Sequence, residues 1–362
     1  MKKILLFYIA LFTGVFSLSA ENAGEKPDYG YALSEVFSKP KFGAYFIGSY
    51  KYSDLDGAHG GPGFNTRLFR AYVDGSIFSD FNYRVQVEFN GNPHIKDFFF
   101  EWVRYPEFKV KIGQFKRAFT FENPYNPFDV GSGDYALGVK RLSGFGDRVG
   151  EPSSGGRDQG LQFQGDLFPI GDDGHRLIHY QAAIYNGNGI NRSDNNSRKD
   201  YIGTIQFQPI KDLYVGVFGW DGTWSDGNVT VDRKRYSFGM KYEHDNWSVR
   251  SEYIHSHGYK ASSIDPESGY VASSDTGNAD AFYATVGVPV NKWFKVYAKY
   301  DMYRDNANKD SRTAIYSITP QFRLHKNLIF QIEYRRNTNN VMAYTNAGRD
   351  FNELWFEYYV RF

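Results

Sequence analysis

Apolar and polar side chains alternate one by one in segments that recur along this chain. Residues 81–90 show the pattern most clearly, with Tyr83, Val85, Val87 and Phe89 on one side and Arg84, Gln86, Glu88 and Asn90 on the other. Successive side chains of a β-strand point to opposite faces of the sheet. Each such segment is therefore predicted to be a strand with one apolar and one charged face, which restricts the chain to an all-β fold.

Sixteen segments with this pattern can be counted, and most are close to the roughly 9–11 residues that a tilted membrane-spanning strand needs. Their boundaries are good to about two to four residues, and the poor alternation of the first, ninth and eleventh leaves the count open by about two. The segments are 42–52, 65–78, 81–90, 97–105, 108–116, 158–168, 176–186, 200–208, 212–222, 233–243, 247–256, 280–289, 293–303, 312–323, 327–337 and 352–362.

The connections between these segments alternate between short and long. Seven are short, such as 79–80, 106–107 and 244–246. Eight are long, namely 53–64, 91–96, 117–157, 187–199, 223–232, 257–279, 304–311 and 338–351. A bacterial outer-membrane barrel has short periplasmic turns and long external loops, whereas a soluble β-sandwich needs no such parity. The parity predicts a closed antiparallel transmembrane β-barrel of about 16 strands over residues 42–362.

Residues 1–20 have the features of a secretory signal peptide. Lys2 and Lys3 precede an apolar run over 4–16, and the small residues that follow would allow cleavage after Ser19 or Ala20. Cleavage would lower the formal net charge from +1 to −1, so the charge gives no reason to expect a nucleic-acid partner. Residues 21–41 are then expected to form a short periplasmic N-terminal tail.

The composition agrees with a barrel. The chain has no cysteine, which excludes disulfides, thiolate metal sites and a lipid-modified N-terminal cysteine. A mean hydropathy of −0.55 excludes a helical membrane protein, but a barrel presents only alternate residues to lipid. Aromatic residues make up 19% of the chain and gather near the short turns, where interfacial aromatic belts lie. Beyond the signal peptide no segment shows a helical periodicity, so no helix is expected.

The longest connection, 117–157, is expected to be functional, because long structureless stretches are uncommon in compact proteins. Its first part, 119–128, is rich in aromatic residues and proline, and the remainder contains eight glycines. In a barrel wide enough to hold water, we expect this third loop to fold into the lumen and narrow it. The alternative is an external flap with no effect on passage.

Six stretches carry a more specific signal. They are Phe69 to Phe78, Phe81 to Phe89, Lys111 to Lys116, Phe119 to Glu122, Arg157 to Gln162 and Tyr185 to Gly189. Together they resemble the phosphate-selective porin O and P family, and the likeness covers most of the mature chain. The chain departs from the family pattern at Arg117-Ala118, where the family often has a proline. The resemblance implies a sixteen-stranded trimeric outer-membrane channel with an infolded third loop, which passes anions.

The predicted inward faces carry twelve basic and eleven acidic residues, so they form no ring of a single sign. The best candidate for anion binding is a basic cluster on the fifth segment and the loop after it. Its members are Lys109, Lys111, Lys116, Arg117, Lys140 and Arg141, and the other pore candidates are Arg84, Glu101, Arg148 and Arg157. Several such side chains would hold phosphate as a multiply hydrogen-bonded dianion. Alternatively, they pair with wall carboxylates such as Glu101 and merely keep the lumen wet.

These observations predict a porin of the bacterial outer membrane, for passive diffusion of small hydrophilic solutes with a weak preference for anions or phosphate. No cofactor, metal or catalytic residue is expected, because His255 and His257 lack further ligands at suitable spacing. The expected partners are small solutes, outer-membrane lipid, further copies in a homotrimer, and a barrel-assembly machinery that recognises the terminal strand ending in Phe362.

Three other functions remain open. The barrel could pass neutral solutes or sugars along lumen aromatics such as Tyr297 and Tyr359. It could be a plugged structural or adhesive surface protein, in which case it would give no conductance steps in a bilayer. It could also be an outer-membrane hydrolase, which would need a nucleophile and an acid beside His255 and His257.

Overall fold

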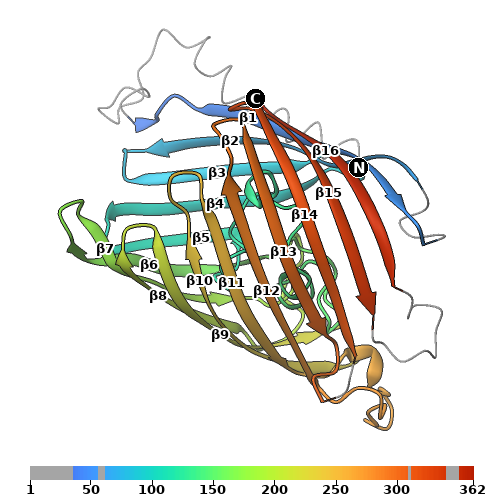
Figure 1. Ribbon diagram of the computed structural model, residues 1–362. Helices are drawn as coiled ribbons and strands as arrows, with labels where there is room; N and C mark the ends of the chain where they lie inside the picture. Colours follow the sequence, from blue (N-terminus) through green and yellow to red (C-terminus); the bar gives the residue numbers. More distant parts are fainter. Residues whose placement is uncertain (1–35, 56–61, 309–310, 340–349) are drawn as a thin grey trace.

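The computed structural model describes residues 36–55, 62–308, 311–339 and 350–362. These residues form sixteen strands in one closed barrel, in which β1 pairs with β16 (Figure 1). The strands are β1 Lys41–Ser53, β2 Gly63–Ile77, β3 Phe81–Glu88, β4 His94–Tyr105, β5 Phe108–Lys116, β6 Arg157–Ile170, β7 His175–Tyr185, β8 Asp200–Ile210, β9 Leu213–Ser225, β10 Thr230–Tyr242, β11 Ser248–His257, β12 Asn278–Pro289, β13 Phe294–Arg304, β14 Arg312–His325, β15 Leu328–Asn339 and β16 Phe351–Arg361.

The predicted fold class is confirmed. Every pair of neighbouring strands is antiparallel, and each strand pairs with the next along the chain. The described strands match the sixteen predicted segments to within three residues at each end, and the largest differences are the early starts of β4 and β10 and the late end of β9. Closure removes the free edges that an open sheet would present, since the backbone groups of β1 and β16 satisfy each other.

Strand β10 shows how the alternation maps onto the two faces of the wall. Tyr236 and Phe238 are 51% and 53% exposed on the outside, while Arg235 and Ser237, which alternate with them, are buried on the inside. Aromatic and aliphatic side chains are exposed in the same way on strands around the barrel. An apolar exterior around a polar interior is the arrangement of a membrane-spanning barrel.

The barrel has one end with short turns and one end with long connections. Strands β8 and β9, for example, are joined by residues 211–212, whereas β5 and β6 are joined by 117–156. At the 211–212 turn, Asp212 has a φ of 65°, in the left-handed region that Asp and Asn adopt more readily than most residues. The predicted parity of short and long connections is thus present in the described strands.

Three short helical turns occur among the described residues: η2 Pro127–Asp129, α3 Leu137–Leu142 and η3 Ala261–Ser263. The prediction of no helix beyond the signal peptide was therefore wrong for α3, because six residues are too few to show a period of 3.6. No helix in the part of the chain that the structure describes is long and apolar enough to cross a bilayer.

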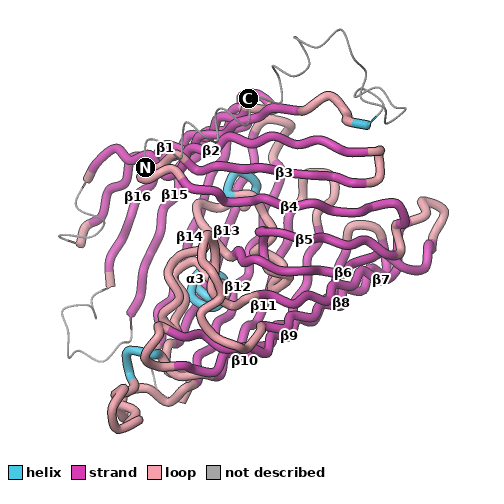
Figure 2. Tube along the Cα trace, turned by 180° about the vertical axis from the view of Figure 1, so that it is seen from behind, coloured by secondary structure: helices cyan, strands magenta, loops and turns pink. Residues whose placement is uncertain are grey.

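The connection 117–156, called the inner loop below, lies inside the barrel. Its helix α3 contacts β11, β12 and β13, and it is drawn within the ring of strands (Figure 2). Ala136, Val139 and Leu142 are fully buried there against wall residues such as Ile254 and Ala281.

The predicted signal peptide, 1–20, and most of the predicted tail, 21–41, lie outside the described residues. Within the tail, Phe37 forms a bridge with Ile77 of β2, and β1 already begins at Lys41. The signal peptide and the tail stay predictions.

Candidate channel constriction

The inner loop is fastened to one wall by buried arginines. Arg117, Arg233 and Arg235 point at the ring of Trp220 on β9, with guanidinium carbons 5.0, 4.6 and 4.8 Å from its centroid. Carboxylates neutralise all three, namely Glu151 and Asp158 for Arg117, Glu151 and Asp200 for Arg233, and Asp147 for Arg235. Because Arg117, Asp147 and Glu151 belong to the loop, this arginine cluster ties the loop to β6, β8 and β10.

Backbone amides of the loop also donate hydrogen bonds to carboxylates on β11 and β13. Phe121 donates its N–H to Glu252 of β11 at 3.1 Å, and Leu137 donates to Asp301 of β13 at 2.8 Å. Leu137 is the first residue of α3, whose early N–H groups have no partner within the helix. The wall carboxylate therefore satisfies a group that would otherwise be buried without a bond.

The loop also reaches the other side of the barrel. Arg67 of β2 binds Asp134 at 2.7 Å, and Phe128 packs edge-on against Tyr359 of β16, with ring centroids 5.8 Å apart. Burial opposes the charge of Asp134, but the nearby cations Lys140 and Arg67 prevail and hold its pKa well below the usual range. The loop is thus anchored to both sides of the lumen.

The described residues leave two adjoining cavities beside the loop, both bordered by Pro124 and Gln181. The first, which we call the basic cavity, has a volume of about 230 Å³ and lies between the start of the loop and the inner faces of β1 to β7. The second, of about 430 Å³, is bordered by β6 to β10 and holds mixed charges, among them Asp166 and Lys241.

Among the described residues that line the basic cavity, six are lysine or arginine and one is acidic. They are Arg70, Arg84, Lys111, Lys116, Arg117 and Arg157, with Asp97 as the acid. The partners of several of these cations do not line the cavity themselves: Arg84 binds Asp74 at 2.7 Å and Lys111 binds Glu101 at 3.3 Å. The surface toward the cavity is therefore more basic than the balanced charge of the lumen suggests.

Lys116 differs from its neighbours. Its ammonium group donates to the carbonyl oxygens of Asn123 and Tyr125, at 2.6 and 2.5 Å, and to the hydroxyl of Tyr135 at 3.1 Å. Within the described ranges, no carboxylate forms an ion pair with it. Lys116 is therefore held by neutral oxygen acceptors of the inner loop rather than by a carboxylate.

The structure divides the predicted cluster. Arg84, Lys111, Lys116, Arg117 and Arg157 come together around the basic cavity, although the Arg117 side chain is fully buried in the arginine cluster. Glu101 is the partner of Lys111. The remaining candidates lie elsewhere. Lys109 forms an ion pair with Asp166, and Lys140 forms one with Asp134. Arg141 is exposed on α3, and Arg148 pairs with Asp275 in the connection between β11 and β12.

Sequence reasoning missed one cation of this region, Lys96. It was placed in a connection, but β4 begins at His94, and Lys96 lies 3.5 Å from Glu88, which also binds Arg70. The register between β3 and β4 shifts at Gln86/Val87, so a bulge turns both Lys96 and Asp97 inward. Simple alternation could not reveal this.

No family model matches the sequence, and no curated protein matches it. Solved structures do share the fold. The anion-selective porin from Comamonas acidovorans superposes with a TM-score of 0.66 at 12% identity, covering 90% of this chain and 99% of that one. The trimer form of OmpT, an outer-membrane protein of Vibrio cholerae, gives 0.60 at 15% identity over 90% and 100%. The outer-membrane channel DcaP of Acinetobacter baumannii gives 0.60 at 13% identity over 94% and 100%. At such low identity the likeness is one of fold.

Proposed function

We propose that this protein is a passive diffusion channel of the bacterial outer membrane that admits small hydrophilic solutes and prefers small anions. The observation that carries the proposal is the basic cavity, whose lining lysines and arginines outnumber its one lining carboxylate among the described residues. A narrow passage of one sign raises the local concentration of counter-ions.

The apolar exterior of the closed barrel supports a place in a lipid bilayer. The outer membrane is supported by the fold shared with the Comamonas porin, OmpT and DcaP, and an anion preference by the description of the first as anion-selective. The trimer form of OmpT supports a homotrimer, which chemical cross-linking of the protein in membranes would test.

Phosphate is the anion that we expect to interact most strongly. Arg84, Lys111 and Arg157 line one cavity from three strands, and a doubly charged oxyanion uses several charged donors at once. The resemblance of the sequence to the phosphate-selective porin O and P family supports the same choice.

Single-channel recording tests the proposal. In a planar bilayer with a KCl gradient, we expect conductance steps and a reversal potential of the sign that chloride preference gives. Lys111→Gln should reduce that preference, because it removes a partly exposed ammonium group that lines the basic cavity. Lys234→Gln is the matched control, since Lys234 is an exposed lysine on the outward side of β10. A cation-selective protein, or equal effects of the two variants, would refute the anion preference.

A sealed barrel is the second candidate, because the inner loop is anchored on both sides of the lumen. It predicts a folded protein without conductance steps. A sugar path along Tyr297 and Tyr359 is not favoured. Tyr359 is buried and hydrogen-bonds Glu357, and the ring of Tyr297 lies against Gly131 of the loop.

A further inference from the structure

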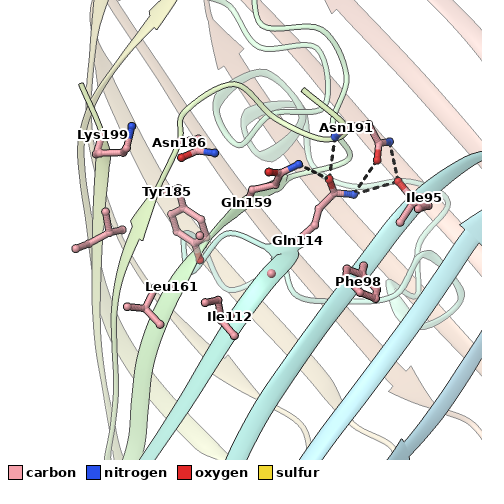
Figure 3. A pocket seen from close by; sticks show the side chains of 13 residues that line it. Ile95, Phe98, Ile112, Gln114, Gln159, Leu161, Tyr185, Asn186, Asn191 and Lys199 are labelled. Carbon is pink, nitrogen blue, oxygen red and sulfur yellow. Dashed lines mark hydrogen bonds between the residues drawn. The ribbon is translucent and has the colours of Figure 1, made fainter. Parts of the chain in front are cut away.

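A hollow of about 590 Å³ lies on the outer side of the wall, across β4 to β7 (Figure 3). Its floor is apolar and consists of the outward side chains of Phe98, Ile112, Leu161 and Ile184. This hollow, called the outer hollow below, is separate from the basic cavity, because the sheet lies between them. It faces the lipid side of the barrel.

Two glycines keep the floor of the hollow recessed. Gly113 of β5 and Gly160 of β6 are register partners, and both line it. Gly113 has a φ of 128°, in the left-handed region that favours glycine, and a Cβ there would lie 2.2 Å from the carbonyl oxygen of Phe98. The backbone path itself therefore fixes the hollow.

The end of the hollow nearest the long connections is polar and firmly built. Asn191, in the connection between β7 and β8, donates its backbone N–H to the side-chain oxygen of Gln114 at 2.8 Å and its amide to the carbonyl of Ile95 at 2.9 Å (Figure 3). Gln114 in turn donates to the carbonyls of Ile95 and Lys96. This connection thus closes one end of the hollow with amide groups.

Two further side-chain amides that line the hollow, those of Asn186 and Gln159, retain free hydrogen-bonding capacity. Among the described residues, the carboxamide of Asn186 has no hydrogen-bond partner, and the side-chain oxygen of Gln159 accepts no bond. Both side chains border the hollow above its apolar floor (Figure 3). Lys199 at the rim is paired with Asp194, so the available recognition is by hydrogen bonds rather than by charge.

We propose that the outer hollow binds one membrane lipid of the leaflet at the long-connection end. Its acyl chain lies along Ile112, Leu161 and Ile184, and the ester, amide or hydroxyl groups next to that chain bond Asn186 and Gln159. The hollow has room for about twenty groups of water size, at about 30 Å³ each, which suits an acyl chain with its polar linkage. The hollow is apolar at its floor and polar toward the long connections. A lipid in this leaflet has the same arrangement, with its acyl chain toward the bilayer centre and its polar groups toward the long connections.

A second copy of the barrel fits the hollow less well. The apolar outer strands of a neighbouring barrel would rest on the rim and leave the Asn186 and Gln159 amides without partners, and buried polar groups need partners. A flexible amphiphile fills the recess and satisfies them together.

Native mass spectrometry of the full protein, purified in mild detergent, tests the proposal. We expect one tightly held lipid per protomer that survives detergent exchange. Ile184→Trp fills the hollow and should abolish this bound lipid, and Asn186→Ala should weaken it. Ile205→Trp is the matched control, because Ile205 is an outward isoleucine of β8 outside the hollow.

Folding of each variant is checked by its β-sheet circular dichroism, and if Ile184→Trp does not fold, Asn186→Ala decides. The proposal is overturned if the wild type keeps no lipid after exchange, or if the folded variants keep the same lipid as the control. It is equally overturned if Ile184→Trp changes the oligomeric state but not the bound lipid, because a second copy would then be the occupant.

Discussion

Within the arginine cluster, Arg117 connects the inner loop to the wall of the barrel. It bonds Asp158 of the wall and Glu151 of the loop, and Glu151 also binds Arg233 of β10. All four side chains are shielded from water. Because a buried charge that loses its partner is strongly unfavourable, such a network stabilises one loop position over others.

Arg117→Ala should lower the free energy of unfolding by about 3–5 kcal/mol, since it leaves Asp158 buried without its cation and removes one of the two cations that bind Glu151. Urea unfolding in detergent, followed by tryptophan fluorescence, measures this. Arg104→Ala serves as control, because Arg104 is an exposed residue 3.7 Å from Asp80, and such surface pairs contribute about 0–1 kcal/mol. Equal losses in the two variants would contradict a special role of the cluster.

Asp134 should stabilise the folded protein even in mildly acidic solution. Its pKa is lower in the folded than in the unfolded protein, where it is about 3.9, so the carboxylate stabilises the fold above that value. The contribution is lost only as the pH falls through the depressed folded-state pKa. The difference in melting temperature between wild type and Asp134→Asn should thus stay constant from pH 7 to pH 5 and shrink only in stronger acid. A difference that already disappears near pH 5 would contradict the depressed pKa.

Among the structural elements, α3 is held by close contact with the wall. A Cβ on Gly138 would lie 2.2 Å from the Cβ of Ala281 on β12. Gly138→Ala should therefore push the helix off the wall, lower stability by about 1–3 kcal/mol, and make the single-channel current noisier. Gly203→Ala is the control, because a Cβ at Gly203 meets nothing within 4 Å. A quiet, stable Gly138→Ala variant would show that the helix can shift without consequence.

The strands were predictable because lipid and water select alternate residues of each one. That rule locates Arg84 and Lys111 on the inner face without any three-dimensional information. It does not apply to an irregular loop, and so Lys140, predicted beside Lys116, instead binds Asp134. The position of Lys96 depended on a bulge, which a two-residue period cannot show.

For the whole molecule, the inner loop decides how much of the lumen is open. Replacing residues 120–154 by a short glycine–serine linker should raise the single-channel conductance severalfold and abolish ion preference, because the loop fills the space beside the basic cavity. Replacing residues 266–270, in the connection between β11 and β12, is the control and should leave both unchanged. If removal of the loop left the conductance unaltered, the passage would not run beside it.

The inner loop gives different strands of the barrel wall different neighbours inside the lumen. Strands β2 to β5 line the basic cavity, while β11 to β13 contact helix α3 of the loop. Inward substitutions on the first arc are expected to alter what permeates while sparing the fold, and those on the second to do the reverse. Substitutions in β2 to β5 could therefore evolve new solute preferences, while the packing of the loop against β11 to β13 preserves the fold.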